Sequence, residues 1–224
     1  MKKLLSAALA AALALALTAC SSTPAETPAR TSDELATILT TAINENGEGG
    51  ADVITASALT AATDWLTENK GMSAEDAAAL VEEYGNVSYE ERETFLTGKG
   101  LTADEINAFQ EAEATARNAQ MIFETLGLSS EDFEAGALSI SLINVRAYGM
   151  AIIKPAEGKE ETVTAALQNF IAGQQQSFEN YLQDQYAIAQ AAKCETVNGY
   201  VVMAMGENSD AIFQAISYAL NANA

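Results

Sequence analysis

The chain has 224 residues, and 31 acidic residues against 11 basic ones give it a formal net charge of −20 at pH 7. Such an acidic chain is a poor electrostatic partner for nucleic acid and for anionic lipid headgroups. Histidine is absent from the sequence, which removes the commonest general base and the commonest protein ligand of zinc, copper and nickel. We therefore expect no nucleic-acid partner, no bound metal and no cofactor.

The first 20 residues have the pattern of a secretory signal. Lys2 and Lys3 form a charged start, and the apolar run over 4–17 is shorter than the roughly 20 residues that a spanning helix needs. Leu17-Thr18-Ala19-Cys20 resembles the lipobox of bacterial lipoproteins, which implies that Cys20 is the lipidated first residue of the mature chain. The alternative is a soluble secreted protein that is cleaved near a cysteine. We predict a signal peptide over 1–19 and a lipid anchor at the outer face of the bacterial cytoplasmic membrane, in the cell envelope.

Residues 20–32 are expected to form a flexible tether, because this stretch contains two prolines and no large apolar side chain. Loss of the signal peptide removes Lys2 and Lys3, so 9 basic residues (11 − 2) remain against 31 acidic ones and the mature charge is −22. Lipidation of Cys20 leaves Cys194 as the remaining thiol, which excludes an intramolecular disulfide.

A helical segment is predicted over 33–130. Thr31 or Ser32 can cap a first helix, whose apolar residues recur at helical spacing from Leu35 to Ile43. The same criterion predicts a second helix over about 52–69 and a long one over about 103–126.

A short phrase occurs three times in this segment, beginning at Gly71, Gly100 and Gly127. Each copy has an apolar residue, then Ser or Thr, then an acid three residues after the Ser or Thr. This pattern is typical of a capping box and predicts the start of an ordered segment. A vestigial calcium loop is the alternative, but the alternating oxygen ligands and closing glutamate of such a loop are missing.

After Phe133 the apolar period changes from 3.6 to 2, which predicts strands. Leu138, Ile140 and Leu142 alternate with small residues, as in a strand with one buried face. Residues 147–154 are apolar on both faces, as in a central strand. Helices are then predicted over about 159–181, over 186–192 and after residue 208.

The dipeptide Asn198-Gly199 predicts a hairpin between strands over 193–197 and 200–205. In that register Cys194 lies opposite Met203, so Cys194 is interpreted as a core thiol and not as a nucleophile. The predicted fold class is α+β. The helical segment is followed by a β-β-α-β-β-α unit over 131–224, in which helices cover one face of an antiparallel sheet.

Four features follow one another in the C-terminal part of the chain. They are Asn144-Val145-Arg146-Ala147-Tyr148-Gly149, the apolar strand ending at Lys154, a Gln-rich helix leading to Tyr181-Leu182-Gln183-Asp184-Gln185-Tyr186, and the strand over 200–205. In this order, residues 139–220 resemble a family of bacterial surface lipoproteins known as domain of unknown function 4358. Members often have a proline where this chain has Gln183. The family has no established activity, so the resemblance implies a location and no mechanism.

Two kinds of candidate site follow from the side chains. Tyr181, Gln185 and Tyr186 form an aromatic, amide-rich face that could bind a protein, peptide or glycan; packing of tyrosine rings at a helix end is the alternative. Paired carboxylates could serve a hydrolase, although most lie where they complement a helix dipole; they occur at 82–83, 90–93, 131–134 and 160–161. We predict a non-enzymatic binding or structural module of the envelope. The alternative is a carboxylate-dependent hydrolase acting on envelope glycan or peptide.

Overall fold

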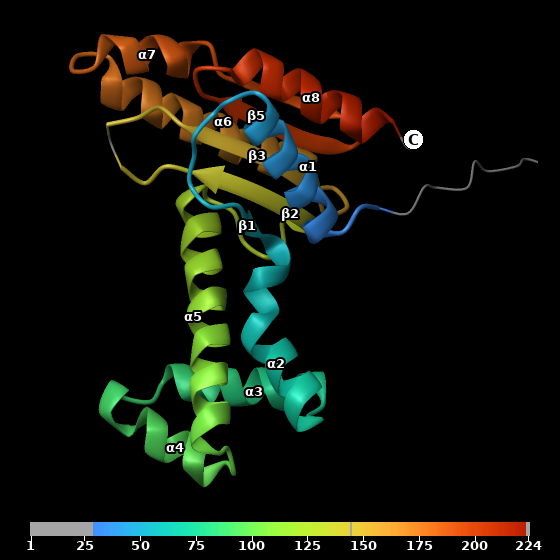
Figure 1. The fold of residues 1–224 in the computed structure, drawn as a ribbon, viewed down its shortest axis with the longest axis vertical. Helices are drawn as coiled ribbons and strands as arrows, with labels where there is room; N and C mark the ends of the chain where they lie inside the picture. Colours follow the sequence, from blue (N-terminus) through green and yellow to red (C-terminus); the bar gives the residue numbers. More distant parts are fainter. Residues whose placement is uncertain (1–28, 144, 223–224) are drawn as a thin grey trace, which may run out of the picture.

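The computed structural model describes residues 29–143 and 145–222. The predicted signal peptide, Cys20 and most of the predicted tether lie outside these residues. Figure 1 shows an upper lobe built on a sheet and a lower lobe of helices, joined by a long helix. None of the helices in the described part is long and apolar enough to cross a membrane. The α+β class predicted from the sequence is confirmed.

The bounds of the elements show where the predictions hold. In chain order they are α1 (Ser32–Glu45), β1 (Ile54–Thr55), the 3₁₀ helix η1 (Ala56–Thr60), α2 (Ala61–Lys70), α3 (Ala74–Gly85), the 3₁₀ helix η2 (Tyr89–Glu91), α4 (Arg92–Gly98), α5 (Ala103–Thr125), β2 (Phe133–Ile140), β3 (Gly149–Pro155), α6 (Glu160–Phe178), α7 (Gln183–Gln190), β4 (Lys193–Val197), β5 (Tyr200–Met205) and α8 (Ser209–Asn221).

The sheet is antiparallel throughout, with the strand order β1-β2-β3-β5-β4. The predicted hairpin joins β4 to β5, and Cys194 pairs with Met203 as the sequence indicated. Its turn has positive φ at both central residues, 49° at Asn198 and 77° at Gly199, as a type I′ turn requires.

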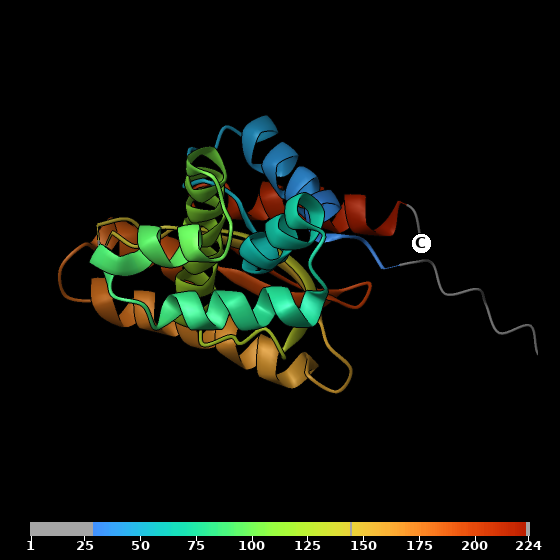
Figure 2. The same ribbon diagram turned by 90° about the horizontal axis from the view of Figure 1, so that it is seen from below.

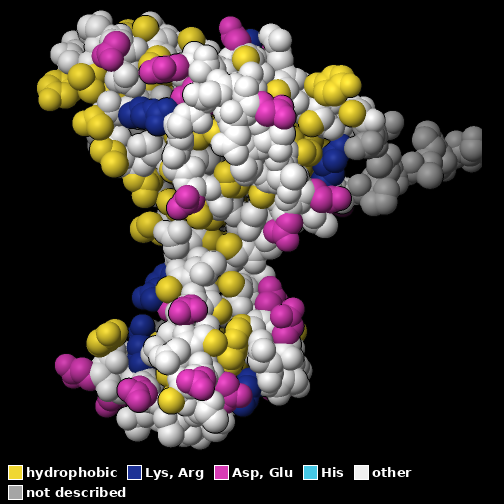
Figure 3. All heavy atoms as spheres, viewed as in Figure 1, with side chains coloured by type: hydrophobic (Ala, Val, Ile, Leu, Met, Phe, Trp, Pro, Cys, Tyr) yellow, Lys and Arg dark blue, Asp and Glu magenta, His cyan; other side chains and the backbone are white. Residues whose placement is uncertain are grey.

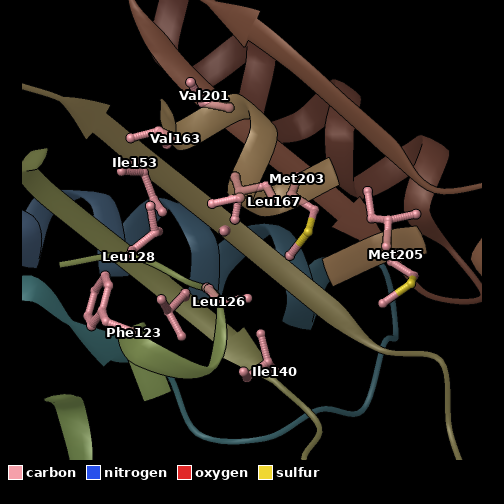
Figure 4. Close-up of a cluster of buried hydrophobic side chains, with 14 of the residues drawn as sticks. Phe123, Leu126, Leu128, Ile140, Ile153, Val163, Leu167, Val201, Met203 and Met205 are labelled. Atoms are coloured by element: carbon pink, nitrogen blue, oxygen red, sulfur yellow. The ribbon is translucent and has the colours of Figure 1, made fainter. Parts of the chain in front are cut away.

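Helices cover both faces of this sheet, so the prediction of a single covered face is wrong. The helices α1 and α8 pack on one face, against Met150, Ile152 and Val202. On the other face, α6, α7 and the end of α5 pack against Ile153, Met203 and their neighbours (Figure 4). The physical reason is that β3 and β5 are apolar on both sides, and each apolar face must be buried.

The segment after α1 also differs from the prediction. The expected helix over 52–69 begins at Ala61, because Ile54 and Thr55 instead add an edge strand to β2. The strand expected over 138–142 begins earlier, at Phe133, and ends at Ile140, which leaves Leu142 in a loop. The first difference arises because Ile54 pairs with Leu138, which is distant in sequence. The second follows the pairing of β2 with the next strand, which ends where Ile140 lies opposite Gly149.

The lower lobe has a core of its own, formed by α2, α3, α4 and the first half of α5. Phe109 lies at its centre, with ring contacts to Trp65 and Tyr84 at 5.9 and 5.1 Å between centroids. The second half of α5 contributes Ile122 and Phe123 to the upper core. One helix therefore belongs to two cores, and Figure 1 shows α5 running from the lower lobe to the sheet.

The three capping phrases do not all start helices. Ser73 caps α3, and Thr102 forms a complete capping box with Glu105 at the start of α5. In the third copy, Asp132 accepts hydrogen bonds from the Ser129 amide and hydroxyl, both at 2.8 Å. A strand follows this turn, because Phe133 begins the pairing with β3.

Candidate binding surface at the end of the sheet

Exposed apolar side chains gather at one end of the upper lobe. The loop between β2 and β3 carries Leu142, Ile143 and Val145, which are 50%, 67% and 60% exposed, and Tyr181 in the turn between α6 and α7 is 77% exposed. The loop and the turn lie at the same end in Figures 1 and 2. We call these four residues the sheet-end surface; hydrophobic side chains are visible along this side of the molecule in Figure 3.

An ion pair with one buried partner anchors the loop that carries this surface. Arg146 Nη2 lies 2.8 Å from Glu48 Oε1, and the Glu48 side chain is only 2% exposed. The other oxygen of Glu48 accepts a hydrogen bond of 2.9 Å from the amide of Asn208. Glu48 thereby joins the loop after α1, the β2–β3 loop and the start of α8. A buried carboxylate needs such partners to offset its desolvation.

A second network lies directly beneath the loop. The Arg146 guanidinium stacks 4.8 Å above the ring of Tyr148, which is fully buried. The Tyr148 hydroxyl lies 3.1 Å from Ser139 Oγ, and Ser139 donates to the carbonyl of Ala51 at 2.6 Å. Burial raises the pKa of Tyr148, so this ring remains a neutral hydrogen-bonding group at physiological pH.

Two glycines lie where the backbone comes close to the side chains of these two networks. A Cβ at Gly50 would lie 1.9 Å from the hydroxyl of the buried Tyr148, so no side chain fits there without moving that ring. A Cβ at Gly206 would lie 2.8 Å from Met150 Cε and 2.9 Å from Glu48 Oε1, so a side chain there would displace the ends of these two side chains. The apolar loop is therefore held on a close-packed polar support.

The three residues predicted to form a binding face have different roles in the structure. The Tyr181 ring is exposed, whereas Tyr186 is half-buried and packs against the upper core. Gln185 Oε1 accepts a hydrogen bond of 2.8 Å from the amide of Ala147. Gln185 thus ties the start of α7 to the β2–β3 loop, next to the exposed apolar residues.

The buried carboxylates of the described residues do not form a pair. They are Glu48 and Asp132. Glu48 lies beyond the end of β5, while Asp132 precedes β2 at the opposite end of the sheet, where Lys159 contacts it at 2.9 Å. Strands of this length separate them by roughly 20 Å, whereas the carboxylates of a glycosidase lie about 5 to 10 Å apart.

Cys194 and the acidic clusters add no further site in the described part of the chain. Burial raises the pKa of the Cys194 thiol to about 11, so the thiolate needed for nucleophilic attack is rare at neutral pH. No group of three acidic or cysteine side chains within 29–143 and 145–222 is placed to hold a metal ion.

The sequence contained only part of the signal for this surface. Arg146 and Tyr148 stand in the stretch that carries the family resemblance, but Glu48 lies in the Gly-rich loop after α1, where no local pattern marks it as a partner of Arg146. Its partners are 98 and 160 residues away. The exposure of Leu142 could not be predicted either, since it continued an apolar alternation.

The family resemblance of the C-terminal part is confirmed. Residues 107–206 match the model of the family described as domain of unknown function (DUF4358). The matched segment begins inside α5, earlier than the resemblance predicted, and it includes the β2–β3 loop, Tyr181 and Gln185. No curated protein and no solved structure matches the chain.

Proposed function

We propose that this protein is a lipid-anchored envelope protein that binds a protein or peptide partner through its sheet-end surface, without turnover. The observation that carries the proposal is the gathering of Leu142, Ile143, Val145 and Tyr181 at one end of the sheet. Exposed apolar side chains that gather at one place on a soluble domain often mark an interaction site.

The place where the chain enters the fold is consistent with a binding surface at the opposite end of the sheet. The Arg30 amide donates to the Tyr200 hydroxyl at 2.9 Å, and Arg30 Nη2 donates to the Ala219 carbonyl at 2.8 Å. Tyr200 begins β5, next to the hairpin, whereas the sheet-end surface lies beyond the other end of that strand. The chain therefore enters the described part of the fold at the end opposite the proposed binding surface.

The chemistry of the surface indicates the class of partner. Three of its four side chains are aliphatic, which suits the apolar core of a protein interface. Glycan sites rely mainly on aromatic faces and hydrogen-bonding groups, and Tyr181 is the one aromatic residue here. We therefore favour a protein or peptide over a glycan.

The hydrolase alternative has less support. Each of the two buried carboxylates is bound to a basic side chain, Arg146 or Lys159. Their contacts hold loops in position, and the distance between them is too great for the two-carboxylate mechanism.

Site-specific photo-crosslinking in living cells tests the proposal. A benzoylphenylalanine residue is placed at Tyr181 or, as a matched control, at Tyr218, which is equally exposed at 77%. Tyr218 lies on α8 beside Ala219, at the entry end of the fold. We expect a discrete crosslinked adduct from position 181 and little from position 218.

The substitution Ile143→Asp provides the second arm of this experiment. It introduces a charge at a side chain that is 67% exposed, so the fold is expected to persist. We expect the adduct from position 181 to fall at least fivefold. Equal adducts from positions 181 and 218, or an adduct that Ile143→Asp leaves unchanged, would refute the proposed surface.

A further inference from the structure

The lower lobe contains an open cavity that is separate from the sheet-end surface. Its volume is about 420 Å³, within the usual range of small-ligand sites. Residues of η2 and α4 form one wall, and residues of α5 form the other. Its charged lining consists of three glutamates and two arginines, with the rings of Tyr84 and Tyr89 beside them. The charged residues are Glu90, Arg92, Glu93, Glu113 and Arg117.

Arg92 is the cavity's unpaired cation. Six basic side chains of the described chain form ion pairs with carboxylates, but Arg92 forms none, although it is half-buried and three glutamates line the same cavity. Its guanidinium lies 4.7 Å above the ring of Tyr84, and its Nε donates to the Val87 carbonyl at 3.3 Å. These contacts fix the orientation of the guanidinium and leave its two terminal nitrogens available for a carboxylate.

Unpaired carboxylates flank this guanidinium. Glu90 and Glu93 line the cavity and make no ion pair with any described residue, whereas Glu113 is engaged by Arg117 at 2.6 Å. The ring of Tyr89 is 88% exposed beside them. The cavity therefore offers an oriented guanidinium for an anionic group, and carboxylates in the same lining for a cationic group.

We propose that this cavity binds a small zwitterion, a free amino acid or a short peptide, through its two charged ends. The ligand carboxylate pairs with Arg92 and the ligand ammonium with Glu90 or Glu93. A simple anion is a poorer match because three carboxylates line the cavity, and a simple cation is a poorer match because of the fixed guanidinium. Partner binding at the sheet-end surface is independent of this site.

Calorimetric titration of the full chain in detergent tests the proposal with three probes. The dipeptide Ala-Ala carries both charges. Its C-terminal amide keeps only the ammonium, and its N-acetyl derivative keeps only the carboxylate. We expect saturable binding of Ala-Ala in the micromolar to millimolar range, and at least tenfold weaker binding of each capped form.

Variants assign each charge to its partner. Arg92→Gln should abolish the advantage of Ala-Ala over its amide, and the double variant Glu90→Gln, Glu93→Gln should abolish its advantage over the N-acetyl form. Lys99→Gln is the matched control. Lys99 is the C-cap residue of α4, and its Nζ lies 4.9 Å from the centroid of the Phe95 ring, but Lys99 does not line the cavity. This variant should bind Ala-Ala with unchanged affinity.

Several outcomes would overturn the proposal. They are no saturable binding of Ala-Ala up to high millimolar concentration, equal binding of the capped forms, and equal losses in Arg92→Gln and Lys99→Gln. Arg92→Gln could also lose binding because the loss of its contact with Tyr84 disturbs the lobe. In that case the double variant Glu90→Gln, Glu93→Gln tests whether charge pairing causes the binding, because the side chains of Glu90 and Glu93 are exposed and their substitution leaves the lobe folded. The crosslinking result at Tyr181 does not depend on any of these outcomes.

Discussion

Glu48 is the residue on which the end of the upper lobe depends. Its carboxylate is buried, pairs with Arg146 and accepts the Asn208 amide. Removing one partner of such a group is costly because the other remains desolvated. Arg146 is 40% exposed, so water can compensate part of its loss.

We predict that Glu48→Gln lowers the free energy of unfolding by about 1–3 kcal/mol, measured by urea denaturation. Glu83→Gln is the control, because its ion pair with Lys99 is formed by exposed side chains. Such surface pairs contribute about 0–1 kcal/mol. Equal effects of the two substitutions would show that burial of Glu48 is not what matters.

Asp132 makes stability depend on pH. Hydrogen bonds from the Ser129 amide, from Lys159 and from the Ser129 hydroxyl lower the pKa of this carboxyl from its ordinary value of 3.8 to about 2. A carboxyl whose pKa is lower in the folded state stabilises the fold when it is ionised. That contribution is complete above pH 4 and disappears as the pH falls through 2.

We predict that Asp132→Asn lowers the free energy of unfolding by about 1–2 kcal/mol at pH 6, and that its difference from the wild type shrinks between pH 4 and pH 2. Urea denaturation at a series of pH values provides the measurement. A difference that stays constant down to pH 2 would mean that the carboxylate charge is not the source of the stabilisation.

At the scale of elements, the β4–β5 hairpin depends on its turn. Gly199 has a φ of 77°, a conformation that strains any β-branched residue. We predict that Gly199→Val destabilises the protein by about 1 kcal/mol or more, seen as a lower melting temperature. In the control, Gly49→Val, the added Cβ meets nothing within 4 Å and the backbone φ is not positive. An unchanged melting temperature for Gly199→Val would contradict the strain argument.

The helix α5 couples the two lobes through its own side chains, beside the second connection that η1 and α2 make. Phe109 from the first half of α5 lies in the lower core, and Phe123 from its second half lies in the upper one. Ala114 lies between them and is exposed. A break at this position would leave each core intact while interrupting the longer of the two connections.

We predict that Ala114→Pro costs about 3 kcal/mol or more and converts a single thermal transition into two, measured by far-UV circular dichroism. Ala103→Pro is the matched control, because Ala103 is the first residue of the same helix, where proline is tolerated. Two transitions already present in the wild type would show that α5 does not couple the lobes.

At the scale of the whole molecule, the two ends of the sheet are assigned different tasks by our proposal. The chain enters at the end where Arg30 contacts Tyr200 and Ala219, and the apolar residues lie at the other end. Cys20 precedes Arg30 by ten positions, and a chain of that length spans at most about 35 Å. In our proposal, an anchor of that reach keeps the protein near the membrane and leaves the sheet-end surface accessible to a partner.

Lipid attachment can be tested by metabolic labelling with a palmitate analogue. We predict that the wild type is labelled and that Cys20→Ala is not, because the thiol of Cys20 is the predicted acceptor. Cys194→Ala should keep its label, since that thiol is half-buried in the fold. Equal labelling of Cys20→Ala and the wild type would refute the anchor.

Local patterns in the sequence predicted the local structure well. The caps at Ser73 and Thr102 and the Asn198-Gly199 turn were identified, because each involves residues within three positions of one another. The register of the hairpin followed from its turn for the same reason. The order of motifs also predicted the family model that residues 107–206 match.

Only the tertiary structure decided how these pieces meet. The sequence could not indicate that α1 would cover the sheet, that Ile54 would pair with Leu138, or that Glu48 would find Arg146. Of the candidate site, Tyr181 and Gln185 were predicted, whereas the exposed loop and its buried support were not. The physical reason is that amphipathic periodicity shows which face of an element is buried but not what covers it, and contacts across about 100 residues leave no local pattern.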